Sequence, residues 1–121
     1  MERTTRYRIL MIGLDAATFD LIEPWVAQGL LPHFHRLMKE GAWGRLESTI
    51  PPVTAVAWNA LATGKNPGKF GVFDFVRREA DGYGVRMVNG GNRKAIPFWR
   101  ILDQHGLHAG VINLPMTYPP D

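Results

Sequence analysis

The chain has 121 residues, of which 45% are hydrophobic and 21% are charged, and this is the composition of an ordinary globular domain. It contains no cysteine, so disulfides and thiolate metal sites are excluded. Its formal net charge of +3 is modest and accompanies no nucleic-acid-binding motif, so we expect no nucleic-acid partner.

The first predicted element is a strand over residues 8–15. The apolar run Ile9–Leu14 ends in the carboxylate of Asp15, and such a run is typical of a strand buried on both faces of a parallel sheet. The run is too short for the core of a signal peptide, and no segment is long enough to span a membrane. We therefore expect a cytoplasmic protein with no membrane partner.

Two helices are predicted next. The first is expected to begin near Asp20 or Glu23 and to end at Gly29. Pro24 is compatible with its first turn, where the missing N–H costs nothing. The second helix is expected over residues 32–41, because a proline opens this segment and a glycine closes it.

The middle of the chain alternates between strand and helix patterns. Residues 45–50 predict a short strand, which the two prolines that follow it bring to an end. Residues 54–63 are rich in alanine and predict a helix that ends at Gly64. We expect a loop over residues 64–71, where glycine and proline are frequent.

A hairpin and a further helix are predicted after this loop. Residues 72–76 and 85–88 read as strands on either side of Asp81-Gly82, a pair that favours a tight turn. Another turn is expected at residues 89–92, and a helix over residues 97–106.

The predicted fold class is α/β. Residues 109–113 predict a second buried strand, and alternating apolar strands and helices indicate a three-layer αβα arrangement with a mainly parallel sheet. Ligands of such sheets bind beyond the carboxyl ends of the strands, where Asp15 is expected. No predicted element follows residue 113 to cover the sheet, so residues 1–121 are expected to be a truncated, amino-terminal portion of one larger domain.

Two nucleotide-binding motifs and a histidine metal site can be rejected. The glycine after the first predicted strand does not belong to a G-x-G-x-x-G motif, and Gly64–Phe70 has one spacer residue too few for a P-loop and ends in phenylalanine instead of serine or threonine. The histidines are spaced for capping or surface positions, not for a shared metal site; they are His33, His35, His105 and His108.

Asp15 and Thr54 are the candidate functional residues. Taken singly, an aspartate after a strand is more often a turn or cap residue, and a threonine at a helix start is an ordinary N-cap. Their order along the chain is more specific, because Asp15 ends a buried strand and Thr54 opens a helix that closes on Thr63-Gly64.

This order resembles the type I phosphodiesterase/nucleotide pyrophosphatase group of the alkaline phosphatase superfamily. The resemblance covers nearly the whole chain. It rests on four stretches, which are residues 9–15, residues 31–41, Pro51-Pro-Val-Thr-Ala-Val-Ala-Trp58 continuing to Gly71, and Val111-Ile-Asn-Leu-Pro-Met-Thr-Tyr-Pro-Pro120.

The resemblance implies a metal-dependent hydrolase that acts on a small phosphoester. Members of the group carry two divalent metal ions, usually zinc. Carried over to this sequence, the resemblance implies that Asp15 is a metal ligand and that Thr54 binds the same metal and attacks phosphorus. A free threonine hydroxyl is a poor nucleophile, and metal coordination favours its alkoxide. The expected course is in-line attack by Thr54, a covalent phospho-threonine intermediate, and hydrolysis of that intermediate by water.

The sequence also departs from the group. Phe70 stands where histidine is common, and no asparagine lies near Asp74-Phe75, which disfavours nucleotide substrates. The remaining metal ligands of the group come from Asp/His pairs that this sequence lacks. We therefore expect an incomplete metal site and a chain that is inactive without the remainder of the catalytic domain.

Other functions remain open on the sequence alone. The chain could be a non-catalytic binding module that retains half of the fold. Sulfatases and metal-dependent mutases of the same superfamily are less favoured, because they use cysteine or serine where this chain has Thr54.

Overall fold

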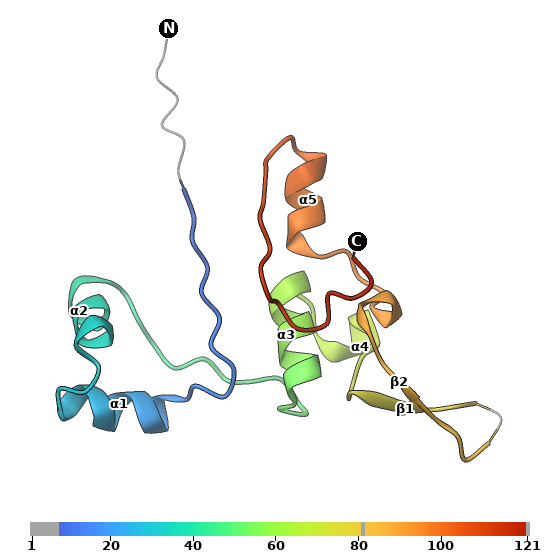
Figure 1. Cartoon of the computed structure of the whole chain (residues 1–121), viewed down its shortest axis with the longest axis horizontal. Coiled ribbons are helices and arrows are strands. Elements are labelled where there is room, and N and C mark those ends of the chain that lie inside the picture. Colours follow the sequence, from blue (N-terminus) through green and yellow to red (C-terminus); the bar gives the residue numbers. More distant parts are fainter. Residues whose placement is uncertain (1–7, 81, 121) are drawn as a thin grey trace, which may run out of the picture. The chain divides into compact units, whose positions relative to one another are not determined.

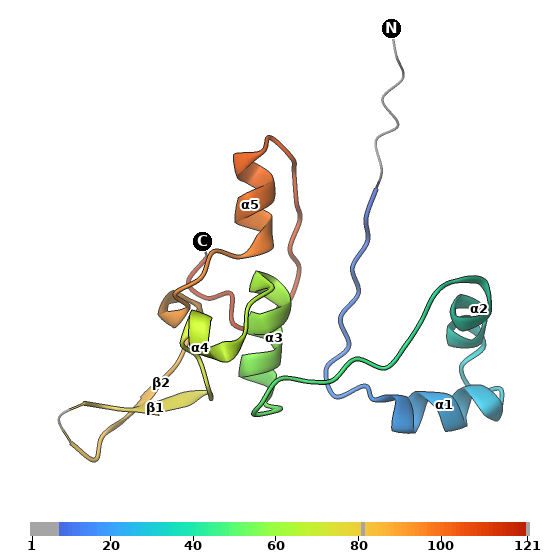
Figure 2. The ribbon, with the colours of Figure 1, turned by 180° about the vertical axis from the view of Figure 1, so that it is seen from behind.

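The computed structural model describes residues 8–80 and 82–120, and their contacts divide the chain into two compact units. The first unit is Met1–Arg45 and the second unit is Leu46–Asp121. Figure 1 labels the helices and strands in chain order, and Figure 2 shows the same ribbon from behind.

The first unit contains helices α1 (Phe19–Ala27) and α2 (Pro32–Glu40). Helix α1 begins beside Asp20, the earlier of the two predicted starts, because the side chain of Thr18 caps it by accepting a hydrogen bond from the Asp20 amide at 3.0 Å. Pro24 consequently lies inside the helix and not in its first turn, so that expectation was wrong.

The predicted end of α1 at Gly29 is confirmed by the backbone that follows the helix. Gly29 has a φ of 75°, a left-handed conformation that glycine adopts without steric cost. The Gly29 amide donates to the Val26 carbonyl at 3.0 Å and the Leu30 amide to the Trp25 carbonyl at 2.9 Å. These two bonds form a Schellman motif, which satisfies carbonyls that the helix end leaves without a partner.

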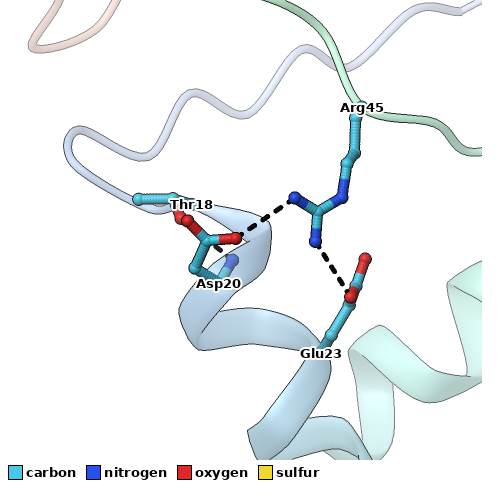
Figure 3. Close-up of polar contacts among 4 residues, drawn as sticks. All are labelled: Thr18, Asp20, Glu23 and Arg45. Atoms are coloured by element: carbon cyan, nitrogen blue, oxygen red, sulfur yellow. Dashed lines mark hydrogen bonds and ion pairs between the residues drawn. The ribbon is translucent and has the colours of Figure 1, made fainter.

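The described part of the first unit has no buried side chain, and contacts at its surface hold it together. Neither α1 nor α2 contains a buried residue. The Phe19 and Trp43 rings lie 5.3 Å apart, and the Arg45 guanidinium bridges Asp20 at 3.1 Å and Glu23 at 3.0 Å (Figure 3). The hydrogen bonds to Glu23 and then to Asp20 raise the pKa of Arg45 above its ordinary value.

The second unit contains three helices and a hairpin. In chain order its elements are α3 (Thr54–Thr63), α4 (Pro67–Phe70), β1 (Val76–Arg78), β2 (Val85–Met87), the 3-10 turn η1 (Gly90–Asn92) and α5 (Phe98–Gln104). Helix α3 has the bounds that its sequence predicts, and α5 lies within the predicted range. The segment that forms helix α4 was predicted to be a loop. A proline at its first position and a glycine at its end delimit this single helical turn.

A small core lies between α3, α4 and the segment that leads into η1. Phe70 and Val56 are fully buried, and Val72 and Val88 pack with them. A backbone bond also ties α4 to the segment that follows η1, because the Lys94 amide donates to the Phe70 carbonyl at 2.9 Å. Burial of this apolar surface is the main stabilising contribution to the second unit.

The predicted hairpin is present, although its first strand begins four residues later than expected. β1 and β2 pair antiparallel, with Val76 opposite Met87 and Arg77 opposite Arg86. The predicted turn at Asp81-Gly82 falls partly outside the described residues, because Asp81 is not among them.

The expected mainly parallel sheet does not appear among the described residues, whose only sheet is the two-stranded hairpin. The ranges 8–15, 45–50 and 109–113 contain no strand. Ile9 and Ile112 are 88% and 92% exposed. A strand is completed only by hydrogen bonds to a neighbouring strand, and an apolar run in the sequence does not supply that neighbour.

The carboxyl-terminal segment is held against η1 in the second unit. The Gly90 amide donates to the Tyr118 carbonyl at 2.7 Å. A Cβ on Gly90 would lie 2.7 Å from the Met116 carbonyl oxygen, so only glycine permits this close approach. Asn89 and Asn92 form a reciprocal capping box around the same turn.

Candidate active site

Thr54 lies at the first position of α3 and is partly buried. The residue that caps the helix is Val53, with φ and ψ of −108° and 139°, and no side chain provides the cap hydrogen bond. The ordinary interpretation of Thr54 as an N-cap is therefore wrong. Its hydroxyl lies in the first helical turn, where the helix dipole places partial positive charge.

The first turn of α3 is well anchored. The amides of Val56 and Ala57 both donate to the Val53 carbonyl, each at 2.9 Å. Ala55 and Val56 are fully buried, so the turn that carries Thr54 is packed against the core of the second unit. A nucleophile needs such a fixed position, because catalysis depends on the orientation of the attacking atom.

Two polar side chains inside α3 bond to its own backbone. Asn59 is 1% exposed and its amide nitrogen donates to the Ala55 carbonyl at 2.7 Å. The Thr63 hydroxyl donates to the Asn59 carbonyl, also at 2.7 Å. The sequence interpretation missed Asn59, and its only signal there is a lone asparagine in an apolar, alanine-rich helix.

Asp15 is exposed and lies at a turn in the first unit. Its Oδ1 accepts a hydrogen bond from the Ala16 amide at 3.1 Å. Ala16 has a φ of 56°, a left-handed conformation that is unfavourable for a residue with a Cβ. Strained backbone of this kind is frequent at functional sites, and here it directly follows the candidate ligand.

Asp15 and Thr54 belong to different units, so the structure describes each of them only within its own surroundings. Their roles as metal ligand and nucleophile stay predictions.

The described residues offer an incomplete donor set for a metal. No group of three or more histidine, aspartate or glutamate side chains lies close enough together to hold a metal ion anywhere in residues 8–80 and 82–120. Catalytic zinc normally takes three protein ligands. A carboxylate such as Asp15 suits zinc or magnesium chemically, but it does not make a site by itself.

The histidines, Phe70 and Asp74 were also considered in the sequence, and the structure places each of them. His105 is the C-cap of α5, where its Nδ1 lies 2.8 Å from the Ile101 carbonyl oxygen, and the remaining histidines are exposed. Phe70, which stands in place of a common histidine, is fully buried in the core. The Asp74 carboxylate accepts from the Phe75 amide at 2.6 Å.

Comparison with known proteins identifies the chain at the level of a family. The family model described as type I phosphodiesterase / nucleotide pyrophosphatase matches residues 9–121. No curated protein and no solved structure gives a significant match. The described residues contain no helix with both the length and the apolar character needed to cross a membrane.

Proposed function

This chain belongs to the type I phosphodiesterase/nucleotide pyrophosphatase family, and we propose that it supplies the nucleophile, Thr54, and one metal ligand, Asp15, of a phosphoester hydrolase. The observation that carries the proposal is the position of Thr54 at the first turn of α3 in a chain that matches this family over residues 9–121. Hydrolase chemistry and a phosphoester substrate follow from the family.

The proposed reaction proceeds through a covalent intermediate on Thr54. Its Oγ attacks phosphorus in line with the leaving group, so that an Oγ–P bond forms as the bond to the leaving oxygen breaks. The leaving alcohol or phosphate departs with the bonding electron pair, and the Thr54 proton passes to solvent. Water then attacks phosphorus of the phospho-threonine, so that a new O–P bond forms as the Oγ–P bond breaks. The phosphate product is released, and the Thr54 Oγ regains a proton from the attacking water.

The first turn of α3 assists both steps in this proposal. The positive end of the helix dipole at Thr54 stabilises negative charge that develops on the phosphoryl oxygens. The buried residues Ala55 and Val56 hold this turn in place, so little reorganisation is needed during the reaction.

A bound divalent metal ion, which we expect to be zinc, would lower the pKa of the Thr54 hydroxyl and neutralise charge on the substrate. Of the described residues, Asp15 and Thr54 are the donors that we assign to it. Two donors are fewer than a catalytic zinc site requires, so we propose that further ligands come from outside the described residues, in the remainder of a larger catalytic domain. That domain would also supply the partner strands of a mainly parallel sheet in a three-layer αβα arrangement.

The test is turnover of the chromogenic diester bis(4-nitrophenyl) phosphate, with zinc supplied, by a protein that carries this chain together with the remainder of the catalytic domain; residues 1–121 by themselves are expected to be inactive. Thr54→Ala should lower kcat by roughly 10⁴-fold or more, as loss of a nucleophile does in other hydrolases. Thr54→Ser keeps a hydroxyl and should retain part of the activity. Thr117→Ala, which removes a hydroxyl bonded to the Leu114 carbonyl at 2.7 Å, is the matched control.

Two results would contradict the proposal. Turnover that persists in Thr54→Ala would remove Thr54 from the nucleophile role. If the protein with the complete catalytic domain showed no turnover with zinc, the alternative of a non-catalytic binding module would be favoured. Asp15→Asn should lower the zinc content measured by elemental analysis, and unchanged zinc content would remove Asp15 from the metal site.

A further inference from the structure

A chain of side-chain contacts leads from α5 to the turn that carries Thr54. The Arg93 Nη1 donates to the Met116 carbonyl at 3.1 Å and to the Asn59 Oδ1 at 3.4 Å. The Arg93 guanidinium also lies over the Trp99 ring, 5.5 Å from its centroid. These contacts hold the guanidinium in one position beside the middle of α3.

Arg93 fixes which way the Asn59 amide points. An asparagine amide has one oxygen that accepts and one nitrogen that donates, and rotation about χ2 exchanges their places. Because the oxygen faces the Arg93 cation, the nitrogen faces the opposite way and donates to the Ala55 carbonyl at 2.7 Å. A flipped amide would place its N–H group against the guanidinium and its oxygen against a carbonyl.

The acceptor of this bond directly follows Thr54 in the chain. The Ala55 carbonyl is one turn below Asn59 in α3, and Ala55 itself is fully buried. Side-chain bonds to the carbonyl four residues earlier alter the local geometry of a helix. The orientation of the first turn of α3 therefore depends on Asn59, and that of Asn59 on Arg93.

We infer that Arg93 is a positioning residue for the nucleophile, acting through Asn59 on the first turn of α3. The link between Arg93 and Asn59 spans 34 residues, so it couples the carboxyl-terminal part of the second unit to the turn at Thr54. The effect of Arg93 on the first turn of α3 is inferred from the contacts alone. Its consequence for catalysis rests on the proposed function.

The first measurement is amide hydrogen exchange, which requires no activity. Arg93→Met should increase exchange at the Val56 and Ala57 amides, both bonded to Val53, by at least about tenfold. The Gly71 amide, bonded to the Pro67 carbonyl at 2.8 Å beside the core, should keep its exchange rate. Arg100→Met, an exposed arginine on α5, is the matched control and should change neither.

Two further variants separate orientation from packing. Asn59→Asp keeps the size and the attraction to Arg93 but removes the donor to Ala55, so it should increase exchange at Val56 and Ala57 as Arg93→Met does. Arg93→Lys keeps the charge without the planar fork and should have an intermediate effect. Unchanged exchange at Val56 and Ala57 in all three variants would overturn the inference. An equal increase at Gly71 would also overturn it, because Arg93 would then serve only general stability.

The second measurement is kinetic and uses the same chromogenic diester. A misoriented nucleophile slows the chemical step without weakening substrate binding, so Arg93→Met should lower kcat about tenfold and leave KM unchanged. If Thr54 is not the nucleophile, the exchange effect should persist while kcat stays constant. An effect on KM alone would contradict the positioning role.

Discussion

The two units of this chain differ in what holds their side chains in place. The second unit has a buried core around Phe70 and Val56, and Thr54 lies on a helix packed against it. In the described part of the first unit, both helices lack buried residues, and Asp15 lies in an exposed turn. The nucleophile candidate is therefore preorganised within its own unit, whereas the ligand candidate lies in an exposed turn of a unit whose helices lack buried residues.

This difference agrees with the chemistry that each residue would perform. An attacking oxygen must be aligned with its target before reaction, and rigid surroundings provide this alignment. A metal ligand on an exposed turn can adjust as the other ligands assemble, because coordination itself contributes to folding. Three experiments test how far the two units differ in the contacts that hold them together.

The largest difference is expected on truncation of an apolar side chain. Phe70→Ala removes a fully buried ring and should lower the free energy of unfolding of the second unit by about 3–5 kcal/mol. Leu37→Ala in α2 truncates a side chain that is 67% exposed, and its effect should stay within about 0.5 kcal/mol. Urea titrations monitored through hydrogen exchange at single amides would report the stability of each unit. Similar losses in both variants would show that the first unit has a comparable core.

An intermediate effect is expected where backbone segments meet. A Cβ on Gly90 would lie 2.7 Å and 3.0 Å from the carbonyl oxygens of Met116 and Tyr118, so Gly90→Ala must displace the carboxyl-terminal segment. We expect a loss of about 1–3 kcal/mol, as for other overpacked sites.

The matched glycine in the first unit has an open environment. Nothing lies within 4 Å of the position of a Cβ on Gly44, so Gly44→Ala should be neutral or slightly stabilising. Thermal unfolding of the two variants checks this pair. A neutral Gly90→Ala would mean that the bond from the Gly90 amide to the Tyr118 carbonyl does not hold the carboxyl-terminal segment.

The sequence predicted the parts of this fold that local chemistry determines. Helix α3 and helix α2 begin and end close to the predicted residues, because the prolines near their starts and the glycines at their ends act on the residues beside them. The start of α1 lies beside Asp20, one of the two predicted starts, because the side chain of Thr18 caps the helix there.

Features that need a distant partner could not be predicted in the same way. Residues 9–14 have the composition of a buried strand, yet their state depends on neighbours that their own sequence does not specify. The bond between Arg93 and Asn59 joins residues 34 positions apart. Neither residue belongs to a spacing pattern, so this part of the candidate site became visible only in the structure.

The smallest effect is expected at Arg45, which joins residues 22 and 25 positions away across the first unit. All its ion pairs are exposed, and such pairs contribute little to stability. Because its pKa is raised, the guanidinium stays charged at neutral and acidic pH and loses its charge only as the pH rises through the raised value.

Arg45→Met should nevertheless move the Trp43 ring relative to Phe19, because Arg45 lies 6.0 Å from the Phe19 centroid and pairs with α1. The ring signals of Trp43 in NMR spectra should shift, and 1 M NaCl should shift them in the same direction in the unmodified chain, since salt screens exposed pairs. Arg36→Met removes only the pair with Glu40 within α2 and should leave these signals in place. Unmoved Trp43 signals in Arg45→Met would mean that ring stacking alone holds the first unit, and that its electrostatic contacts do not distinguish it from the second.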